Sequence, residues 1–271
     1  MVLDDVEQAC LVSAGGDSGV FSKIYSSSNE SLKDLFQCFS LKGKDVLTVL
    51  ASSDHLFYSY YYGASSVDAF DINYLTKYYY YLRRWTILYQ NRFYPASDMF
   101  RTHRTLFKLL DKVQCRNKEE EDALLFWDTY LKRVKPSQHE ELYCVERCNQ
   151  SIKDLKRLKN LIENQELTFY QGDLFGDFYC PKKYDVIITS NILEYAWNPI
   201  KLERAHDCLK GLLKDKGQII GSHFIFYPDM ERFITERECF EKDFDYLEFH
   251  EYQEKGLTKS FPLGYSYTKK C

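Results

Sequence analysis

The stretch from Leu47 to Asn73 places two short apolar runs on either side of one aromatic segment. Leu47–Leu50 and Val67–Ile72 have strand character, and Leu56–Tyr62 between them has the length of a short helix. Gly63 can end that helix because glycine adopts the left-handed conformation common at helix C-termini. A strand, a helix and a second strand in close succession favour a parallel pair, since parallel strands need a crossover connection.

The same alternation continues along most of the chain. The first strand extends over Asp45–Leu50. The remaining predicted helices are Ser31–Phe39, Tyr74–Leu88, Met99–Lys112, Glu119–Lys132, Asn149–Asn164 and Lys201–Leu213, the last closed by Gly217. The remaining predicted strands are Leu167–Gln171, Tyr184–Ser190, Gln218–Phe226 and a closing antiparallel pair, Asp245–Tyr252 and Gly264–Lys269. This pattern predicts an α/β fold with a doubly wound, mostly parallel, seven-stranded sheet.

The alternation also indicates how the chain is divided. Residues 89–143 break it with helix-like segments between Pro95 and Pro136, and we interpret them as a helical insertion. Residues 1–43 are predicted to form an N-terminal helical extension, and residues 44–271 the ligand-binding domain that carries the insertion.

Composition excludes several classes of protein. A net charge of −4 gives no electrostatic case for a duplex nucleic-acid binder and leaves a local basic patch open, and we expect no nucleic-acid partner. Nine scattered cysteines without a C-x-x-C motif favour free thiols in a reducing compartment, and we expect no metal site. There is no basic, apolar leader and no apolar run near about 18 residues, so we expect no signal peptide or transmembrane segment and a cytoplasmic location. The oligomeric state stays open.

The 23 tyrosines and 19 phenylalanines admit two interpretations. They could pack a core, or they could line a pocket for a small molecule or lipid headgroup.

Ligands of a doubly wound sheet bind over the carboxyl ends of its strands. Ala51, Ser52, Ser53 and Asp54 follow the first strand, where small side chains let a ligand approach the backbone. The glycine motif that usually marks a nucleotide-binding turn at this place is absent. Acidic Asp54 suits a ligand amine better than a pyrophosphate. The alternative is that these residues simply cap the next helix.

Two further strand ends carry acids. Asp71 ends the second strand about 20 residues past Ala51, where a carboxylate can accept hydrogen bonds from two ribose hydroxyls. Ile72, next to it, is predicted to line the same site. Asp173 could accept from an exocyclic adenine amine while Leu174 packs against the ring, although this sequence is also common in plain turns.

Candidates for the reaction centre follow the later strands. Asn191, Glu194 and Tyr195 come after Tyr184–Ser190 and would lie beside a transferred group; Glu194 could instead cap or pair on the next helix. His223 lies near the end of Gln218–Phe226 with Tyr227, and could line the same cleft or be a packed core histidine.

These segments resemble class I S-adenosylmethionine-dependent methyltransferases. The resemblance covers Asp45–Asn73, Leu167–Leu174, Tyr184–Tyr195, Leu213–Phe226 and Gly264–Lys269. It implies S-adenosyl-L-methionine as the cofactor. It also implies that Ala51–Asp54 cradles the methionine part, Asp71 binds the ribose, and Asp173 with Leu174 binds the adenine.

A narrower resemblance rests on Leu47–Asp54, Phe70–Asn73 and Phe126–Asp128. These residues look like the betaine-lipid-synthase-like branch, which transfers a 3-amino-3-carboxypropyl group from the same cofactor. The insertion would then cover the cleft as a substrate lid. Its Arg92, Arg101, His103 and Arg104 are candidate anchors for an anionic substrate, with plain surface solvation as the alternative.

Three functions follow as hypotheses. The first is a methyltransferase that acts on a small molecule or lipid headgroup. The second is a 3-amino-3-carboxypropyl transferase. The third is a non-catalytic methyltransferase-like binding protein, which the glycine-less loop after the first strand favours.

Overall fold

A computed structural model of the chain describes residues 2–14, 24–25, 32–93, 103–135, 143–144, 152, 154–196, 198–222, 236–250 and 262–270. Contacts divide the chain into two compact units. The helical unit comprises Met1–Asn29, Leu50–Phe57 and Ile72–Glu166, and the sheet unit comprises Glu30–Val49, Tyr58–Asp71 and Leu167–Cys271. The predicted boundary between residues 1–43 and 44–271 stays a prediction.

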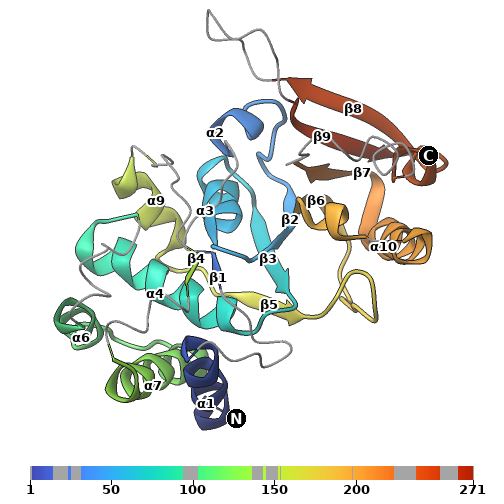
Figure 1. Cartoon of the computed structure of the whole chain (residues 1–271). Coiled ribbons are helices and arrows are strands. Elements are labelled where there is room, and N and C mark those ends of the chain that lie inside the picture. Colours follow the sequence, from blue (N-terminus) through green and yellow to red (C-terminus); the bar gives the residue numbers. More distant parts are fainter. Residues whose placement is uncertain are drawn as a thin grey trace, which may run out of the picture. The chain divides into compact units, whose positions relative to one another are not determined.

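The sheet unit holds seven strands in the order β5-β3-β2-β6-β7-β9-β8 (Figure 1). Their bounds are β2 Asp45–Val49, β3 Ser66–Asp71, β5 Thr168–Gln171, β6 Tyr184–Ser190, β7 Leu213–Gly221, β8 Phe244–His250 and β9 Pro262–Lys269. The pairs from β5 across to β7 are parallel, and β9 runs antiparallel to both of its neighbours. The predicted α/β fold with a mostly parallel seven-stranded sheet and a closing antiparallel pair is confirmed.

The centre of the sheet is apolar because parallel strands are covered on both faces. Val186, Ile187 and Ile188 of β6 are fully buried beside β2. Helix α10 (Pro199–Leu212) begins where the Asn198 side chain accepts the Lys201 N–H at 2.9 Å, with Pro199 in the first turn. The short helix α2 (Leu32–Leu35) packs near β9.

The prediction that Gly217 closes the helix before β7 is wrong. Helix α10 ends at Leu212, and Gly217 lies inside β7, where the register with β6 shifts between Tyr184/Leu213 and Val186/Gln218. A Cβ atom on Gly217 would lie 2.9 Å from the Lys214 carbonyl oxygen. The glycine therefore marks a close backbone approach at a strand irregularity, a role that sequence alone does not distinguish from a helix end.

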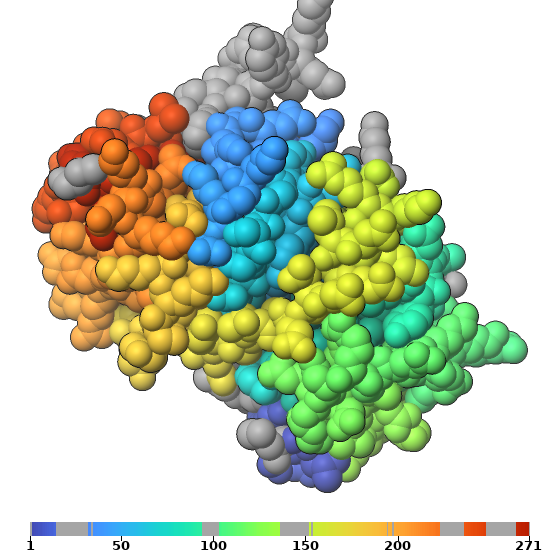
Figure 2. All heavy atoms as spheres, turned by 180° about the vertical axis from the view of Figure 1, so that it is seen from behind, coloured from blue at the N-terminus to red at the C-terminus, as the bar shows by residue number. Residues whose placement is uncertain are grey.

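The helical unit is built around helix α4 (Leu75–Gln90), which is buried on almost every side. Its other helices are α1 Val2–Ser13, α6 Arg104–Leu110, α7 Lys118–Arg133 and α9 Leu155–Ile162. The helix α3 (Asp54–Tyr61) begins in this unit. A two-stranded parallel pair, β1 (Ile24–Tyr25) with β4 (Tyr143–Cys144), also belongs to it. Figures 1 and 2 show α1 beside α7, and the two helices pack on each other.

Aromatic side chains form much of the core of the helical unit. The ring of Tyr78 stacks on Phe126 at 3.9 Å between centroids, and Phe126 stacks on Tyr130 at 5.9 Å. The tyrosine hydroxyls have polar partners: Tyr78 donates to Asp5 at 2.5 Å, and Tyr81 donates to Glu119 at 2.8 Å. For these residues core packing accounts for the aromatic composition.

None of the helices in the described part of the chain offers the long apolar stretch that crossing a lipid bilayer requires.

Candidate functional site

The strand order of the sheet unit places its switch point between β2 and β6. The chain runs outward from β2 through β3 to β5 on one side, and from β6 to β7 on the other. Ligands of such sheets bind outside the carboxyl ends of the strands at this point. These strands end at Asp71 in β3, Gln171 in β5 and Ser190 in β6.

Asp71 is the last residue of β3 and lies opposite Gln171 of β5 in the parallel register. It is 8% exposed, and its carbonyl oxygen accepts the Gly172 N–H at 3.1 Å. The end of β3 is therefore held against the turn that follows β5. Ile72, the next residue, is 49% exposed.

The residues after β5 form a compact turn. The Asp173 carboxylate accepts the Phe175 N–H at 2.9 Å, and the Asp173 carbonyl accepts the Gly176 N–H at 2.9 Å. Leu174 is buried. These bonds match the interpretation of this segment as an ordinary turn. The Asp173 carboxylate has a second oxygen, so a contact with adenine is compatible with the turn.

The carboxyl end of β6 turns sharply. Ser190 has a positive φ of 54°, its hydroxyl donates to the Asn191 amide oxygen at 3.3 Å, and the Ser222 N–H after β7 donates to its carbonyl at 3.1 Å. Asn191 then precedes a single 3-10 turn, η2 (Ile192–Tyr195), in which Glu194 lies and at whose end Tyr195 is half-exposed.

Asn191 and Tyr195 thus follow the strand end at which they were predicted, whereas His223 and Tyr227 lie outside the described residues. The roles of these residues in a reaction stay predictions.

The segment Ala51–Asp54, in the helical unit, has a backbone conformation unusual for its residues. Ala51 has a φ of 38° and Ser53 a φ of 69°, both in the left-handed region that favours glycine. The Ser53 N–H donates to the Leu50 carbonyl at 2.5 Å, and the Ser53 carbonyl accepts the Phe57 N–H at 3.1 Å, which starts α3. The glycines are absent from the sequence, but the backbone shape that glycine ordinarily supplies is present.

Ser52 and Asp54 are fully buried and hydrogen-bonded to each other, with the Ser52 hydroxyl donating to Asp54 Oδ2 at 2.8 Å. Asp54 Oδ1 forms a 2.8 Å ion pair with Arg83 Nη1 of α4, and neither side chain is exposed. Arg83 Nη1 also donates to the Ser52 carbonyl. The predicted role of Asp54 as an acceptor for a ligand amine stays a prediction, but its carboxylate already has a cationic partner.

Sequence reasoning missed Arg83. The signal is an Arg83-Arg84 pair inside a helix that is otherwise rich in tyrosine and aliphatic residues. Arginines on an almost wholly buried helix need anionic or carbonyl partners, because burial of an unpaired charge is prohibitively unfavourable.

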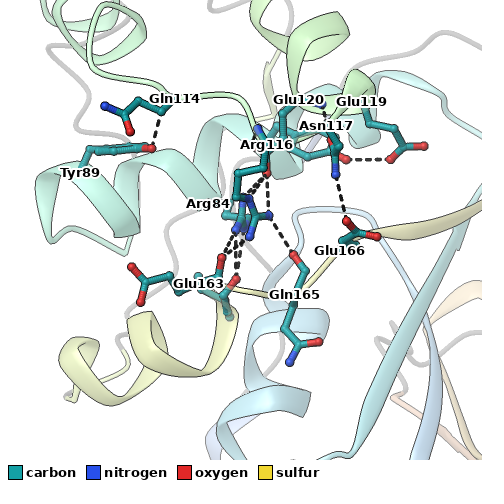
Figure 3. A network of polar contacts seen from close by, with 12 residues as sticks. Arg84, Tyr89, Gln114, Arg116, Asn117, Glu119, Glu120, Glu163, Gln165 and Glu166 are labelled. Carbon is teal, nitrogen blue, oxygen red and sulfur yellow. Dashed lines mark hydrogen bonds and ion pairs between the residues drawn. The ribbon is translucent and has the colours of Figure 1, made fainter.

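The neighbouring Arg84 belongs to a second buried network (Figure 3). Arg84 forms a 2.6 Å ion pair with Glu120 of α7 and donates to the carbonyls of Ile162 and Glu163 at the end of α9. Burial by itself would raise the pKa of Glu120, but hydrogen bonds from Arg116 and the charge of Arg84 lower it. Arg84 lies inside α4, Glu120 in the first turn of α7, and Ile162 and Glu163 at the end of α9, so these contacts join the three helices.

The predicted substrate anchors of the insertion differ in their exposure. Arg92 and Arg104 are exposed, whereas His103 is buried at the start of α6. Burial lowers the pKa of His103, against an opposing hydrogen bond to the Leu131 backbone. Arg101 lies outside the described residues.

No cluster of three or more histidine, cysteine or acidic side chains suited to a metal ion occurs in the parts of the chain that the structure covers.

Ser53 bears on whether the loop fits a ligand. Its hydroxyl is fully buried and has no hydrogen-bond partner among the described residues. A buried hydroxyl without a partner is uncommon and calls for an explanation. A polar ligand group that approaches the left-handed backbone here would supply the missing partner.

No protein-family model and no curated protein matches this sequence. Solved structures with similar folds include a methyltransferase from Pyrococcus furiosus, with 8% identity, a TM-score of 0.41 and coverage of 89% of this chain and 82% of that one. A TehB-like SAM-dependent methyltransferase from Corynebacterium glutamicum has 12% identity and a TM-score of 0.43, with 97% and 95% covered. The N-methyltransferase NodS from Bradyrhizobium japonicum, in complex with S-adenosyl-L-homocysteine, has 7% identity and a TM-score of 0.40, with 98% and 86% covered. At such identities and scores these similarities carry no argument about activity.

Proposed function

We propose that this chain is an S-adenosylmethionine-dependent transferase, most simply a methyltransferase that acts on a small molecule or lipid headgroup. The observation that supports it best is the end of β3, where Asp71 closes the strand next to the turn after β5. A carboxylate at this place in a doubly wound sheet accepts hydrogen bonds from the two hydroxyls of a ribose.

The other proposed cofactor contacts follow from the neighbouring strand ends. Asp173 and Leu174 would bind the adenine, and Ile72 and Asn191 would line the rest of the adenosyl group. The loop Ala51–Asp54 would bind the methionine part through its left-handed backbone and the buried Ser53 hydroxyl.

Transfer of a carbon group from this cofactor requires few reactive side chains. The bound cofactor supplies an activated carbon on a sulfonium, so the protein has to bind, align the acceptor in line with that carbon and exclude water. Asn191, Glu194, Tyr195 and His223 are the proposed residues beside the acceptor. No general base is required where the acceptor is a neutral amine or a thiolate.

The test is a titration of the protein with S-adenosylhomocysteine by calorimetry, with wild type and the Asp71→Asn variant. We expect the variant to bind roughly 10- to 150-fold more weakly, because hydrogen bonds to a charged acceptor are worth about 1.5–3 kcal/mol. Asp68→Asn is the matched control, since Asp68 lies on the same strand but pairs with Lys182 and Tyr184.

Two results would contradict the proposal. Wild type that shows no binding would remove the cofactor assignment and favour a non-catalytic binding protein. Equal affinities for Asp71→Asn and wild type would remove the role of Asp71. Product analysis separates the two chemistries: S-adenosylhomocysteine indicates methyl transfer, and methylthioadenosine indicates aminocarboxypropyl transfer.

A further inference from the structure

Two adjacent arginines of α4 lie in similar surroundings but hold different parts of the helical unit. Arg83 and Arg84 are both buried, and each forms one short ion pair, with Asp54 and Glu120 respectively. Successive residues on a helix point about 100° apart, so the two guanidinium groups leave α4 in different directions. Arg84 reaches helix ends, whereas Arg83 reaches the loop at Ala51–Asp54.

The guanidinium of Arg83 is held on several sides. Nη1 donates to Asp54 Oδ1 and to the Ser52 carbonyl, and Nη2 donates to the Phe93 carbonyl at 3.1 Å. Its central carbon lies 5.3 Å from the ring centroid of Phe57 and 4.8 Å from that of Phe93, within cation–π distance. Such a group is preorganised, and its rigid fork fits a carboxylate and a carbonyl at once.

The residues that Arg83 holds are interleaved with the two strained ones. Ala51 and Ser53 have left-handed φ values, and Ser52 and Asp54, which bond Arg83, follow them directly. A left-handed conformation is unfavourable for residues with a side chain and persists only where surrounding contacts enforce it. Ser52 adds its hydroxyl bond to Asp54, so both carboxylate oxygens have donors.

We propose that Arg83 is a positioning residue: through Asp54 and the Ser52 carbonyl it holds the Ala51–Asp54 loop in the shape that paired glycines would otherwise allow. Asp54 then binds Arg83 rather than a ligand amine, and the loop offers a ligand its backbone and the Ser53 hydroxyl. The consequence for ligand binding rests on the proposed function, whereas the consequence for loop conformation does not.

The test compares Arg83→Lys with Arg84→Lys, which keep the charge and remove the planar fork from one pair each. For each variant we would measure urea stability, affinity for S-adenosylhomocysteine by calorimetry, and hydrogen exchange of the Ser53 and Phe57 amides, which donate to the carbonyls of Leu50 and Ser53. Both variants are expected to lose stability. Only Arg83→Lys is expected to accelerate exchange of these two amides and to weaken binding, by roughly ten-fold or more.

A rescue separates positioning from general destabilisation. Glycine adopts left-handed φ without enforcement, so Ala51→Gly in the Arg83→Lys background is expected to slow the exchange again and to recover several-fold of the lost affinity. The same Ala51→Gly change in the Arg84→Lys background is expected to change neither.

The outcomes are distinct. Equal amide exchange in the two lysine variants, or no rescue of exchange by Ala51→Gly, would overturn the proposal. If wild type binds no S-adenosylhomocysteine, the proposed function fails, and the exchange measurements still decide the role of Arg83. If wild type binds but Arg83→Lys binds equally well despite faster exchange, Arg83 positions the loop but the loop is not part of the ligand site, and the proposed consequence for ligand binding is overturned.

Discussion

Ala51 has a backbone conformation that alanine disfavours. Its φ of 38° lies in a region that glycine populates freely and alanine does not. The left-handed conformation destabilises a residue with a Cβ by roughly 1–2 kcal/mol. Glycine avoids this cost but lowers stability by roughly 0.5–1 kcal/mol through its larger entropy loss on folding. We therefore expect Ala51→Gly to raise the free energy of unfolding by about 0.5–1 kcal/mol in urea denaturation.

The matched control is Ala123→Gly in the interior of α7, where the backbone is helical. There the same change should lower stability by about 1 kcal/mol. If both variants lose stability to the same extent, Ala51 does not have the left-handed conformation described here.

The candidate site could be predicted only in part at this scale. The position of Asp71 at the end of the second strand follows from spacing alone, and β3 does end at Asp71, whereas its role in binding a ribose stays a prediction. The left-handed loop could not be found, because a pattern search for glycine detects the residue and not the backbone angle that Ala51 and Ser53 adopt. Arg83 was missed because its partner Asp54 lies far away in sequence.

At the scale of elements, β9 packs closely against its antiparallel neighbour β7. A Cβ on Gly264 of β9 would lie 2.6 Å from the Gly221 carbonyl oxygen and 2.7 Å from a methyl of Leu35. The carbonyl belongs to the backbone of β7 and cannot move without shifting the strand. We expect Gly264→Ala to lower the free energy of unfolding by about 1–3 kcal/mol, the usual range for overpacking.

Gly211, in the last turn of α10, supplies the opposite case. Nothing lies within 4 Å of a Cβ built there, and alanine is favoured over glycine in a helix. Gly211→Ala should therefore raise stability by about 0.5–1 kcal/mol. Stability changes of opposite sign for these two alanine substitutions, measured by thermal and urea unfolding, would support the described packing; a loss at both positions would contradict it.

The elements themselves were largely predictable. The predicted strand Tyr184–Ser190 is β6 to the residue, and Tyr74–Leu88 differs from α4 by one or two residues at each end. These elements could be predicted because buried strands appear as short continuous apolar runs and buried helices as longer aromatic or apolar segments. The prediction failed at Gly217, where a glycine required by close backbone approach looks the same as one that ends a helix.

At the scale of the whole molecule, resistance to acid depends on carboxylates whose pKa differs between the folded and unfolded states. Lys214 at the start of β7 bonds both Asp45 of β2 and Asp185 of β6, at 2.8 and 2.9 Å, and so joins three neighbouring strands. The hydrogen bond from Lys214, with another from Ser66, lowers the pKa of Asp45 from 3.8 to about 2. Burial opposes the shift at Asp185, but the Asp45 N–H and Lys214 still lower its pKa.

The direction in which stability changes with pH follows from proton binding. A carboxyl with a lower pKa in the folded state binds fewer protons there, so its contribution is complete above about pH 4 and is lost as the pH falls towards 2. The side chains of Asp45 and Lys214 are 31% and 40% exposed, so solvent screens the pair, and we expect a loss of about 1 kcal/mol over this range. Urea denaturation between about pH 6 and about pH 2.5 should show it in wild type and much less in Lys214→Met.

Lys118→Met is the control, because Lys118 bonds Asp122 at a similar 2.7 Å on α7 but is 76% exposed. It should leave the acid slope of the wild type unchanged, since an exposed pair is screened in both states. Should Lys214→Met lose as much stability on acidification as wild type does, other carboxylates carry the acid dependence.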